Sequence, residues 1–473
     1  MVFSSSLFLL YFLPLFLLLY FFIPARFKNL FIVIASLLFY TWGAPLFVFV
    51  LCSSLLLDFF VAKQIAKSTQ KGKRVWLVFS IVTSVGLMLY FKYANFFIDN
   101  LNQVLYERGY YRLDWTEVAL PVGISFFTFH QLSYIIDVYR GVKKPMSNLV
   151  NYGLYILFFP QLIAGPIIRF NEISDQIIDR KKEETLDNKL IGIFRFIIGL
   201  SKKVIIANSL GSVADSFFNS PIADLGTGQA WLAIIAYTFQ IYFDFSGYSD
   251  MAIGLARTMG FVFPENFNNP YIAENITDFW RRWHITLSRW MRDYLYIPLG
   301  GNKVSDVRMY LNLWIVFLIS GFWHGASWNF VIWGTYHGVF LILDRVFLIK
   351  LTSRIGKIPR VLLTFFIVVI GWVFFRVDNF DDAILFIGKL FHYNNPVPGF
   401  NITGSFYFAL VLALLFSFAG IYAQVQSMQM SIYTQLGSSK RWLSLSVVSV
   451  FLLVISIAEI TSSSFNPFIY FRF

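Results

Sequence analysis

Charged residues are scarce in this chain of 473 residues. Only 14% of them are Asp, Glu, Lys or Arg, whereas 57% are hydrophobic and 20% are aromatic. Soluble domains are about half apolar and about one quarter charged, so this composition excludes an ordinary soluble protein. Several stretches approach the ~20 apolar residues that cross a bilayer core. The sequence therefore predicts an all-α polytopic membrane protein with roughly 11–13 membrane segments, some of them re-entrant, in one domain over residues 1–473.

Cysteine and the common catalytic motifs are nearly absent as well. The single Cys52 excludes an internal disulfide and a Cys-x-x-Cys metal site. The chain contains no G-x-S-x-G, H-E-x-x-H, Walker A or G-x-G-x-x-G motif. Serine-hydrolase, zinc-peptidase and nucleotide-driven reactions therefore have no motif in this sequence, and we expect no metal ion.

Acidic residues are outnumbered by basic ones, 26 to 38, which gives a formal net charge of +12. The basic residues gather between apolar stretches, at 63–74 and 140–144, as the positive-inside rule predicts for cytoplasmic loops. The charge therefore indicates a membrane protein in contact with lipids and does not argue for nucleic-acid binding. Three apolar stretches precede the first basic loop, so we expect the N-terminus outside: Leu7–Ile23, Leu30–Trp42 and Leu46–Ala62.

The apolar stretch Tyr152–Ile168 contains Pro160, Gly165 and Pro166. Proline and glycine at this density break a helix. Broken backbone at membrane depth survives only where protein buries it or where it lines a watery cavity. We therefore expect a re-entrant or half-membrane segment here.

Two acidic residues, Asp244 and Asp250, fall in the predicted span Ala230–Ile253. Buried acids cost free energy unless they are paired, so we expect each to pair with an arginine or to cap a helix end. The following segment Asn266–Asn275 is polar and is interpreted as a linker.

Three of the five histidines lie between Phe279 and His337. If residues 280–295 form one helix, five side chains fall on one stripe of it: Trp280, His284, Leu287, Met291 and Tyr294. The arginines lie away from this stripe, so the helix is amphipathic and suits the cytoplasmic interface of a membrane. A histidine on the buried stripe needs a hydrogen-bond partner, and the pattern leaves open whether His284 is structural or belongs to an active site.

His324 lies between Gly321 and Gly325, at the junction of two apolar stretches. An ionisable side chain at membrane depth indicates function, because placing it there costs free energy. The same spacing also fits a close-packing motif of small residues with an incidental histidine. His337 lies between two glycines in a similar frame, so spacing alone does not decide between these interpretations.

Motifs along nearly the whole chain resemble one protein superfamily. They are 1–5 (MVFSS), 123–130 (GISFFTFH), 159–166 (FPQLIAGP), 243–250 (FDFSGYSD), 279–301, 320–328 (SGFWHGASW) and 468–473 (FIYFRF). In this order they are similar to the membrane-bound O-acyltransferase (MBOAT) superfamily. The likeness is strongest to its polysaccharide branch, the membrane subunit of alginate O-acetyltransferase and its peptidoglycan-acetylating relatives.

The resemblance implies a role for each histidine. His324 matches the catalytic histidine of the family, which we expect to act as a general base, and His284 matches its companion. We expect His130, His337 and His392 to be structural.

The resemblance also implies the MBOAT fold, with a catalytic core at about residues 120–350, and an O-acyltransferase activity. The implied donor is acetyl-coenzyme A, and the acceptor is an exported cell-envelope polysaccharide of the alginate type. Transfer would be direct or through an extracytoplasmic, esterase-like acetyltransferase of the same pathway. The protein would lie in the bacterial cytoplasmic (inner) membrane.

Candidate substrate-binding residues are Arg281, Arg282 and Trp323. The arginines would attract the phosphates of the donor, although anchoring to anionic lipids fits the sequence equally well. A cytoplasmic donor and an external acceptor can meet only inside the protein. We therefore expect His284 and His324 to share one cavity connected to both membrane faces, with backbone such as residues 159–166 lining it.

Two other functions stay open. D-alanyl transfer to teichoic acid occurs in the same superfamily. A polysaccharide transporter would also have many spans and buried polar groups, but this sequence shows no inverted repeat of hydropathy and no paired broken helices.

Overall fold

The computed structural model describes residues 2–395, 402–434, 438–462 and 465. Within these residues every regular element is a helix, and no β-strand is present. The all-α prediction is therefore confirmed, as expected where backbone polar groups must be satisfied within the bilayer. The C-terminal motif at 468–473 lies outside the described residues.

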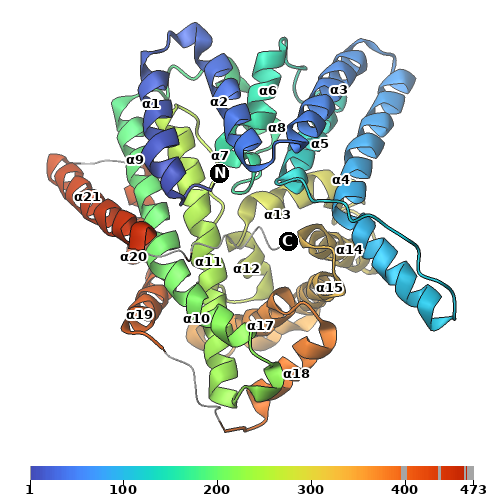
Figure 1. The fold of residues 1–473 in the computed structure, drawn as a ribbon, viewed down its shortest axis with the longest axis vertical. Helices are drawn as coiled ribbons and strands as arrows, with labels where there is room; N and C mark the ends of the chain where they lie inside the picture. Colours follow the sequence, from blue (N-terminus) through green and yellow to red (C-terminus); the bar gives the residue numbers. More distant parts are fainter. Residues whose placement is uncertain (1, 396–401, 435–437, 463–464, 466–473) are drawn as a thin grey trace. The chain divides into compact units, whose positions relative to one another are not determined.

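The chain forms two compact units, and Figure 1 shows their helices in sequence colours. Unit 1 comprises residues 7–183 and Phe261–Phe263, and unit 2 comprises residues 2–6, 184–260 and those from Pro264 on. The α-helices of unit 1 are α1 (Leu13–Phe22), α2 (Lys28–Gly43), α3 (Phe47–Lys67), α4 (Gln70–Glu107), α5 (Ile124–Tyr139), α6 (Leu149–Leu157), α7 (Phe159–Leu162) and α8 (Phe170–Ile178).

The helix break expected within residues 152–168 is present in unit 1. After α6 and the single turn α7, residues 163–169 are not helical. Side chains satisfy part of this backbone: the Phe159 amide donates to the Ser36 hydroxyl at 3.1 Å, and Gln161 Nε2 donates to the Tyr155 carbonyl at 2.6 Å. Residues 158–168 are all buried, so protein surrounds the irregular backbone that lipid would not tolerate.

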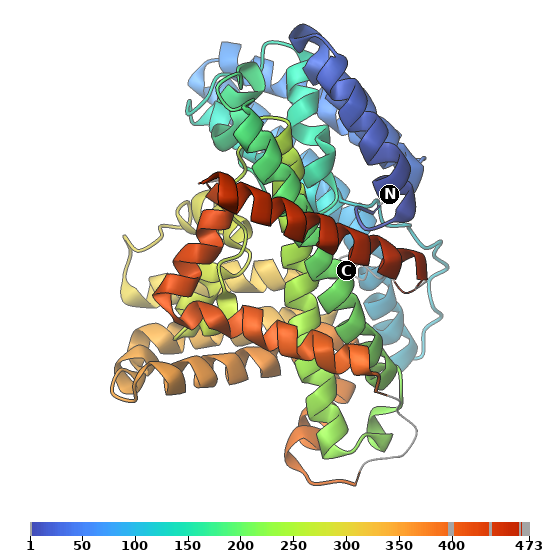
Figure 2. The ribbon, with the colours of Figure 1, turned by 90° about the vertical axis from the view of Figure 1, so that its left-hand side faces the viewer.

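The long α11 is the central element of unit 2. It contacts α9, α10, α17, α18 and α19, and Figure 1 shows α9, α10 and α11 side by side. Figure 2 shows α19, α20 and α21 following one another, and both α20 and α21 contact α9. The α-helices of unit 2 are α9 (Leu186–Ser201), α10 (Asn208–Phe218), α11 (Thr227–Thr258), α12 (Ile276–Arg282), α13 (Ile285–Met291), α14 (Asp306–His324), α15 (Trp328–Leu343), α16 (Ile349–Thr352), α17 (Lys357–Arg376), α18 (Phe380–Phe391), α19 (Gly404–Phe418), α20 (Ala423–Thr434) and α21 (Ser439–Ser462).

Six helices in the described ranges are long and apolar enough to cross a membrane. They are α3, α4, α17, α21, α15 with its continuation to Thr352, and α19 with its continuation to Ile421. Other predicted spans form shorter helices, such as α2, α5 and α9 with 16 residues each. The multi-pass membrane protein is confirmed, while the count of roughly 11–13 segments, the outside N-terminus and the single-domain assignment stay predictions.

The single helix predicted over residues 280–295 is wrong. The backbone leaves the helical region at Trp283 and turns left-handed at His284, so that α12 and α13 are separate. The residues of the predicted stripe are all buried nonetheless. Both short helices bury an apolar face, so the periodic spacing of buried residues continues across the break. The sequence pattern therefore gives no sign that the helix is interrupted.

Helices α14 and α15 form a hairpin whose backbones touch at two glycines. A Cβ atom on Gly334 would lie 2.3 Å from the Phe317 carbonyl oxygen and 3.0 Å from Gly321 Cα. Small residues permit this close approach between helices. The packing role considered for Gly321 is therefore present, and it sets the position of His324 one turn further along α14.

We expect Gly334→Val to destabilise unit 2, because its side chain would collide with the backbone of α14. Overpacking of this kind typically costs about 1–3 kcal/mol, so the melting temperature of the purified protein should fall. Gly388→Ala in α18 is the control, because a Cβ there meets nothing within 4 Å. Equal melting temperatures for the two variants would contradict the close approach.

Candidate active site

His324 is the last residue of α14 and is only 6% exposed. Its Nδ1 atom lies 2.6 Å from the carbonyl oxygen of Ser320, one turn earlier. A carbonyl oxygen can only accept a hydrogen bond, so Nδ1 carries the proton. In the neutral ring the lone pair is then on Nε2, and His324 presents a proton acceptor at that atom.

Aromatic rings from three helices surround His324. The ring centroids of Trp323, Trp333 and Phe375 lie 4.9, 4.9 and 5.5 Å from that of the imidazole, all edge-on. These rings belong to α14, α15 and α17. They place the imidazole in apolar surroundings, where electrostatic interactions are stronger than in water.

His284 lies at the break between α12 and α13 and is 1% exposed. Its φ of 44° and ψ of 53° are left-handed, which costs a non-glycine residue roughly 1–2 kcal/mol. Two backbone hydrogen bonds, each 2.9 Å long, hold the break: the Asn268 amide donates to Arg282, and the Ile285 amide donates to Asn266. Strained backbone of this kind concentrates at functional sites.

Asn266 also fixes the imidazole of His284. The Nδ1 atom of His284 lies 3.0 Å from Asn266 Oδ1, which also accepts from the Thr286 hydroxyl at 2.8 Å and the Thr286 amide at 3.4 Å. The amide can only donate, which identifies the oxygen and places the imidazole proton on Nδ1. Burial lowers the pKa of His284, and a positive charge on His324 lowers it further. The ring is therefore neutral near pH 7, with its lone pair on Nε2.

Aromatic rings link the two histidines. Trp283, directly before His284, contacts Trp372 with ring centroids 4.9 Å apart. Trp372 stacks with Trp333 at 6.1 Å, and Trp333 contacts His324 at 4.9 Å. The structure therefore brings both predicted catalytic histidines to one cluster of side chains within unit 2. A cavity that joins them to both membrane faces stays a prediction.

The other three histidines lie in different surroundings. His130 in unit 1 and His337 on α15 are buried, and neither ring has a hydrogen-bond partner among the described residues. His337 packs against Trp280 and Trp333, with ring centroids 5.1 Å away in both cases. His392 directly follows α18 and is exposed. Their structural role stays a prediction.

The predicted substrate-binding residues also differ in their surroundings. Arg281 is exposed, whereas Arg282 forms an ion pair with Asp278 at 2.9 Å within α12. Trp323 is buried beside the histidine that ends α14. Arg289 on α13 adds a second exposed cation near Arg281 in sequence. Binding of substrate by any of them stays a prediction.

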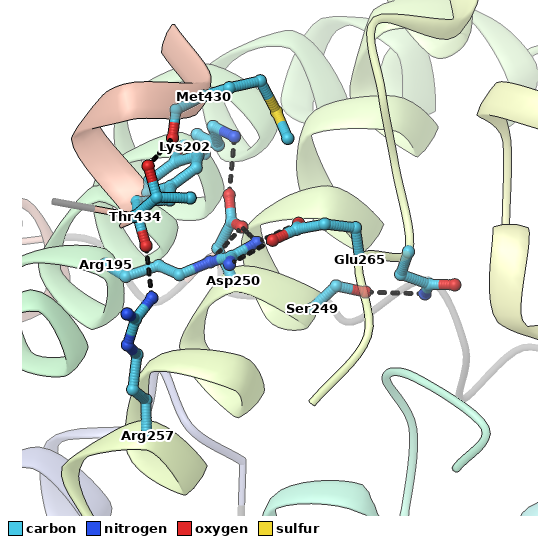
Figure 3. A network of polar contacts seen from close by, with 10 residues as sticks. Arg195, Lys202, Ser249, Asp250, Arg257, Glu265, Met430 and Thr434 are labelled. Atoms are coloured by element: carbon cyan, nitrogen blue, oxygen red, sulfur yellow. Dashed lines mark hydrogen bonds and ion pairs between the residues drawn. The ribbon is translucent and has the colours of Figure 1, made fainter. Parts of the chain in front are cut away.

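Asp244 and Asp250 are paired, although only one of their three basic partners is an arginine. Asp250 accepts from Arg195 at 2.8 Å and from Lys202 at 2.6 Å, and Asp244 lies 2.8 Å from the Lys203 ammonium nitrogen. Figure 3 shows the network around Asp250. Among the described residues, no group of three or more His, Cys, Asp and Glu side chains could hold a metal ion.

Asn266 is the residue of this site that sequence reasoning missed. Residues 266–275 read as a polar linker, yet Asn266 is fully buried. Its side-chain partners Ser249 and His284 are 17 and 18 residues away in the chain. No helical spacing connects residues so far apart on different elements, so the pattern carries no signal for this contact.

Comparisons with known proteins agree with the resemblance of the motifs. The family model of MBOAT, the membrane-bound O-acyltransferase family, matches residues 76–375, which include both histidines of the site. The chain is 45% identical over 398 residues to a probable alginate O-acetylase AlgI of Azotobacter vinelandii, covering 84% of this chain and 79% of that protein. It is 40% identical over 418 residues to a peptidoglycan O-acetyltransferase of Helicobacter pylori, covering 81% and 78%. Identity to a teichoic acid D-alanyltransferase of Bacillus subtilis is 31% over 285 residues, covering 58% and 70%.

Proposed function

This chain belongs to the membrane-bound O-acyltransferase family and is an O-acyltransferase, and from that premise we propose that it acetylates an exported cell-envelope polysaccharide with acetyl-coenzyme A as donor. One observation carries the chemistry. The Ser320 carbonyl holds the proton of His324 on Nδ1 and so leaves Nε2 as a proton acceptor.

In the proposed reaction, Nε2 of His324 removes the proton from an acceptor hydroxyl while the hydroxyl oxygen attacks the thioester carbonyl carbon. The new C–O bond forms, the C–S bond breaks, and the imidazolium returns its proton to the departing coenzyme A thiolate. The thioester is already activated, so the demanding step is removal of the hydroxyl proton, which suits a general base with a pKa near the working pH.

The proposed role of His284 follows from its tautomer. With the proton held on Nδ1 by Asn266, the Nε2 lone pair of His284 can accept a hydrogen bond from the acceptor sugar and orient it. A positive charge on His324 lowers the pKa of His284, so the second ring stays neutral while the first carries the transferred proton.

Acetyl transfer is favoured over D-alanyl transfer by the similarity of the relatives. Identity and coverage are higher for the probable alginate O-acetylase and the peptidoglycan O-acetyltransferase than for the teichoic acid D-alanyltransferase. We therefore propose a polysaccharide acceptor of the alginate type, reached directly or through an extracytoplasmic acetyltransferase. D-alanyl transfer is the second candidate.

The proposed topology places the donor on the cytoplasmic side of the bacterial inner membrane and the N-terminus outside. Arg281 and Arg282 would attract the phosphates of the coenzyme, and Trp323 would flank its acyl arm. This proposal is supported by the exposure of Arg281 and by the contact of Trp323 with His324. The acceptor would approach the histidines from the opposite membrane face.

We expect His324→Gln to lower acetylation of the exported polymer by at least about a hundredfold, because glutamine can bond to Ser320 but cannot act as a base. The acetyl content of the polymer is measured by NMR in cells expressing each variant, with the amount of protein in the membrane as a check. His337→Leu is the matched control, since that buried histidine has no hydrogen-bond partner among the described residues. Normal acetylation in the His324→Gln strain would refute the proposed base.

We expect the surface of α13 to face the cytoplasm. In a Cys52→Ser background, Arg289→Cys should react with a membrane-impermeant thiol reagent in inverted vesicles and not in intact spheroplasts. Leu287→Cys is the control for access, because Leu287 on the same helix is 2% exposed and should react poorly in both. Labelling of Arg289→Cys from outside would reverse the proposed direction of transfer.

A further inference from the structure

Residues 259–275, between α11 and α12, include side chains that support the proposed active site. Their interpretation rests on the proposed function. We propose that Asn266 is a positioning residue that orients His284 for acyl transfer, and that an ion-pair clamp of Arg195, Asp250 and Glu265 holds Asn266 in place.

The hydrogen bonds of Asn266 have a fixed direction. Its Oδ1 accepts from His284 and from two donors of Thr286, and its Nδ2 donates to Ser249 on α11 at 2.9 Å. Rotation of the amide by half a turn would set its NH₂ group against these donors. Asn266 is fully buried, so a mispaired polar group there would cost about 1–3 kcal/mol. The amide therefore fixes both the orientation of the His284 ring and the nitrogen that carries its proton.

The ion-pair clamp is centred on Arg195. The Arg195 guanidinium is 3% exposed and bonds to Asp250 on α11 at 2.8 Å. It also bonds to both carboxylate oxygens of Glu265, at 2.7 and 2.5 Å. Lys202 binds the second oxygen of Asp250 at 2.6 Å. Figure 3 shows Arg195 lying between the two carboxylates, so one cation from α9 ties α11 to the segment that carries Asn266.

The clamp and the hydrogen bonds that hold His284 use neighbouring residues of the chain. On α11, Ser249 bonds to Asn266 while the next residue, Asp250, bonds to Arg195. On the segment, Glu265 bonds to Arg195 while the next residue, Asn266, bonds to the histidine. Two parallel cross-links therefore fix the same short stretch of backbone, and loss of the clamp would displace the asparagine.

The same network also contacts α20, so it could have a purely structural role. The guanidinium lies 4.4 Å from the ring centroid of Tyr433 on α20, and Arg257 donates to the Tyr433 carbonyl. If the network served only to hold α20 and α9 against α11, its loss would reduce the amount of folded protein. It would not change how catalysis depends on pH.

We expect Asn266→Asp to shift the pH dependence of the enzyme. A carboxylate that accepts from Nδ1 favours the imidazolium form and so raises the pKa of His284 by about 1 unit or more. The proposed reaction needs both imidazoles neutral, and His324 sets the acid limb while the pKa of His284 is low. The raised pKa of His284 should therefore add a second protonation to the kcat profile and move its acid limb to higher pH, with KM for acetyl-coenzyme A unchanged. Purified full-length protein is assayed with acetyl-coenzyme A and deacetylated alginate oligosaccharide, by release of the coenzyme thiol.

Asn268→Asp is the charge-matched control, since it places a carboxylate two residues along the same segment, where the Asn268 side chain accepts from Gln426 instead of a histidine. Its acid limb should stay in place. An unshifted limb in Asn266→Asp, or an equal shift in Asn268→Asp, would overturn the proposal.

A double-mutant cycle tests the clamp. Asn266→Ala should lower kcat by about tenfold or more, as expected when a catalytic group is no longer held in position. Glu265→Gln should lower kcat in the wild-type background but have little further effect in the Asn266→Ala background, because coupled residues are not additive. Additive effects would show that Glu265 does not act through Asn266.

A second readout does not depend on activity. In protein labelled with [¹⁵N]histidine, the difference spectrum against His284→Gln should report the Nδ1-protonated tautomer, and Asn266→Ala should give a mixture of tautomers. If the wild-type protein transfers no acetyl group but shows this tautomer change, the proposed function fails and the positioning by Asn266 stands. If wild-type transfer is normal and the tautomer does not respond to Asn266→Ala, the positioning fails alone.

Discussion

Two oxygen atoms that can only accept hydrogen bonds determine what the buried histidines of this protein can do. The Ser320 carbonyl lies 2.6 Å from Nδ1 of His324, and the side-chain oxygen of Asn266 lies 3.0 Å from Nδ1 of His284. Each acceptor holds a proton on Nδ1, which leaves the lone pair of the neutral ring on Nε2. Without these bonds the rings would adopt either tautomer, and a general base could present a proton where an acceptor is needed. The nitrogens of His337 have no hydrogen-bond partner among the described residues, so no such bond fixes its tautomer.

The rest of unit 2 can be understood as what keeps these two bonds in place. Close contact between glycines lets α14 and α15 meet at the helix end that carries His324. Backbone pairing with residues 266–268 holds the left-handed conformation of His284. The ion pairs of Asp250 then tie the supporting segment to α9 and α11. Buried charges are costly unless they are paired, so loss of one partner would leave the others unpaired. The pairing allows these charges to lie within a largely apolar protein.

Composition and hydropathy were enough to predict an all-helical membrane protein, because lipid imposes its constraint on every span alike. The break within residues 152–168 was also predictable, since Pro160 and Gly165 act locally. The break at His284 was not, because backbone hydrogen bonds to Asn266 and Asn268, on another segment of the chain, impose it and the apolar period of 280–295 continues across it. Asn266 was not predicted for the same reason, because its hydrogen bonds join residues on different elements. The motif likeness made His324 a candidate from the sequence, whereas its tautomer required the geometry of the helix end.

The central claim is that Nε2 of His324 faces the acyl group of the donor, with His284 beside it. The most direct measurement is a cryo-electron microscopy structure of the full-length protein with S-acetonyl-coenzyme A, an analogue that cannot transfer its acyl group. The account predicts that the ketone carbon lies about 3–3.5 Å from the position of the attacking oxygen beside His324 Nε2, with Nδ1 still bonded to Ser320. An analogue whose ketone lies away from both histidines, or a His324 ring turned so that Nδ1 faces the ketone, would contradict it.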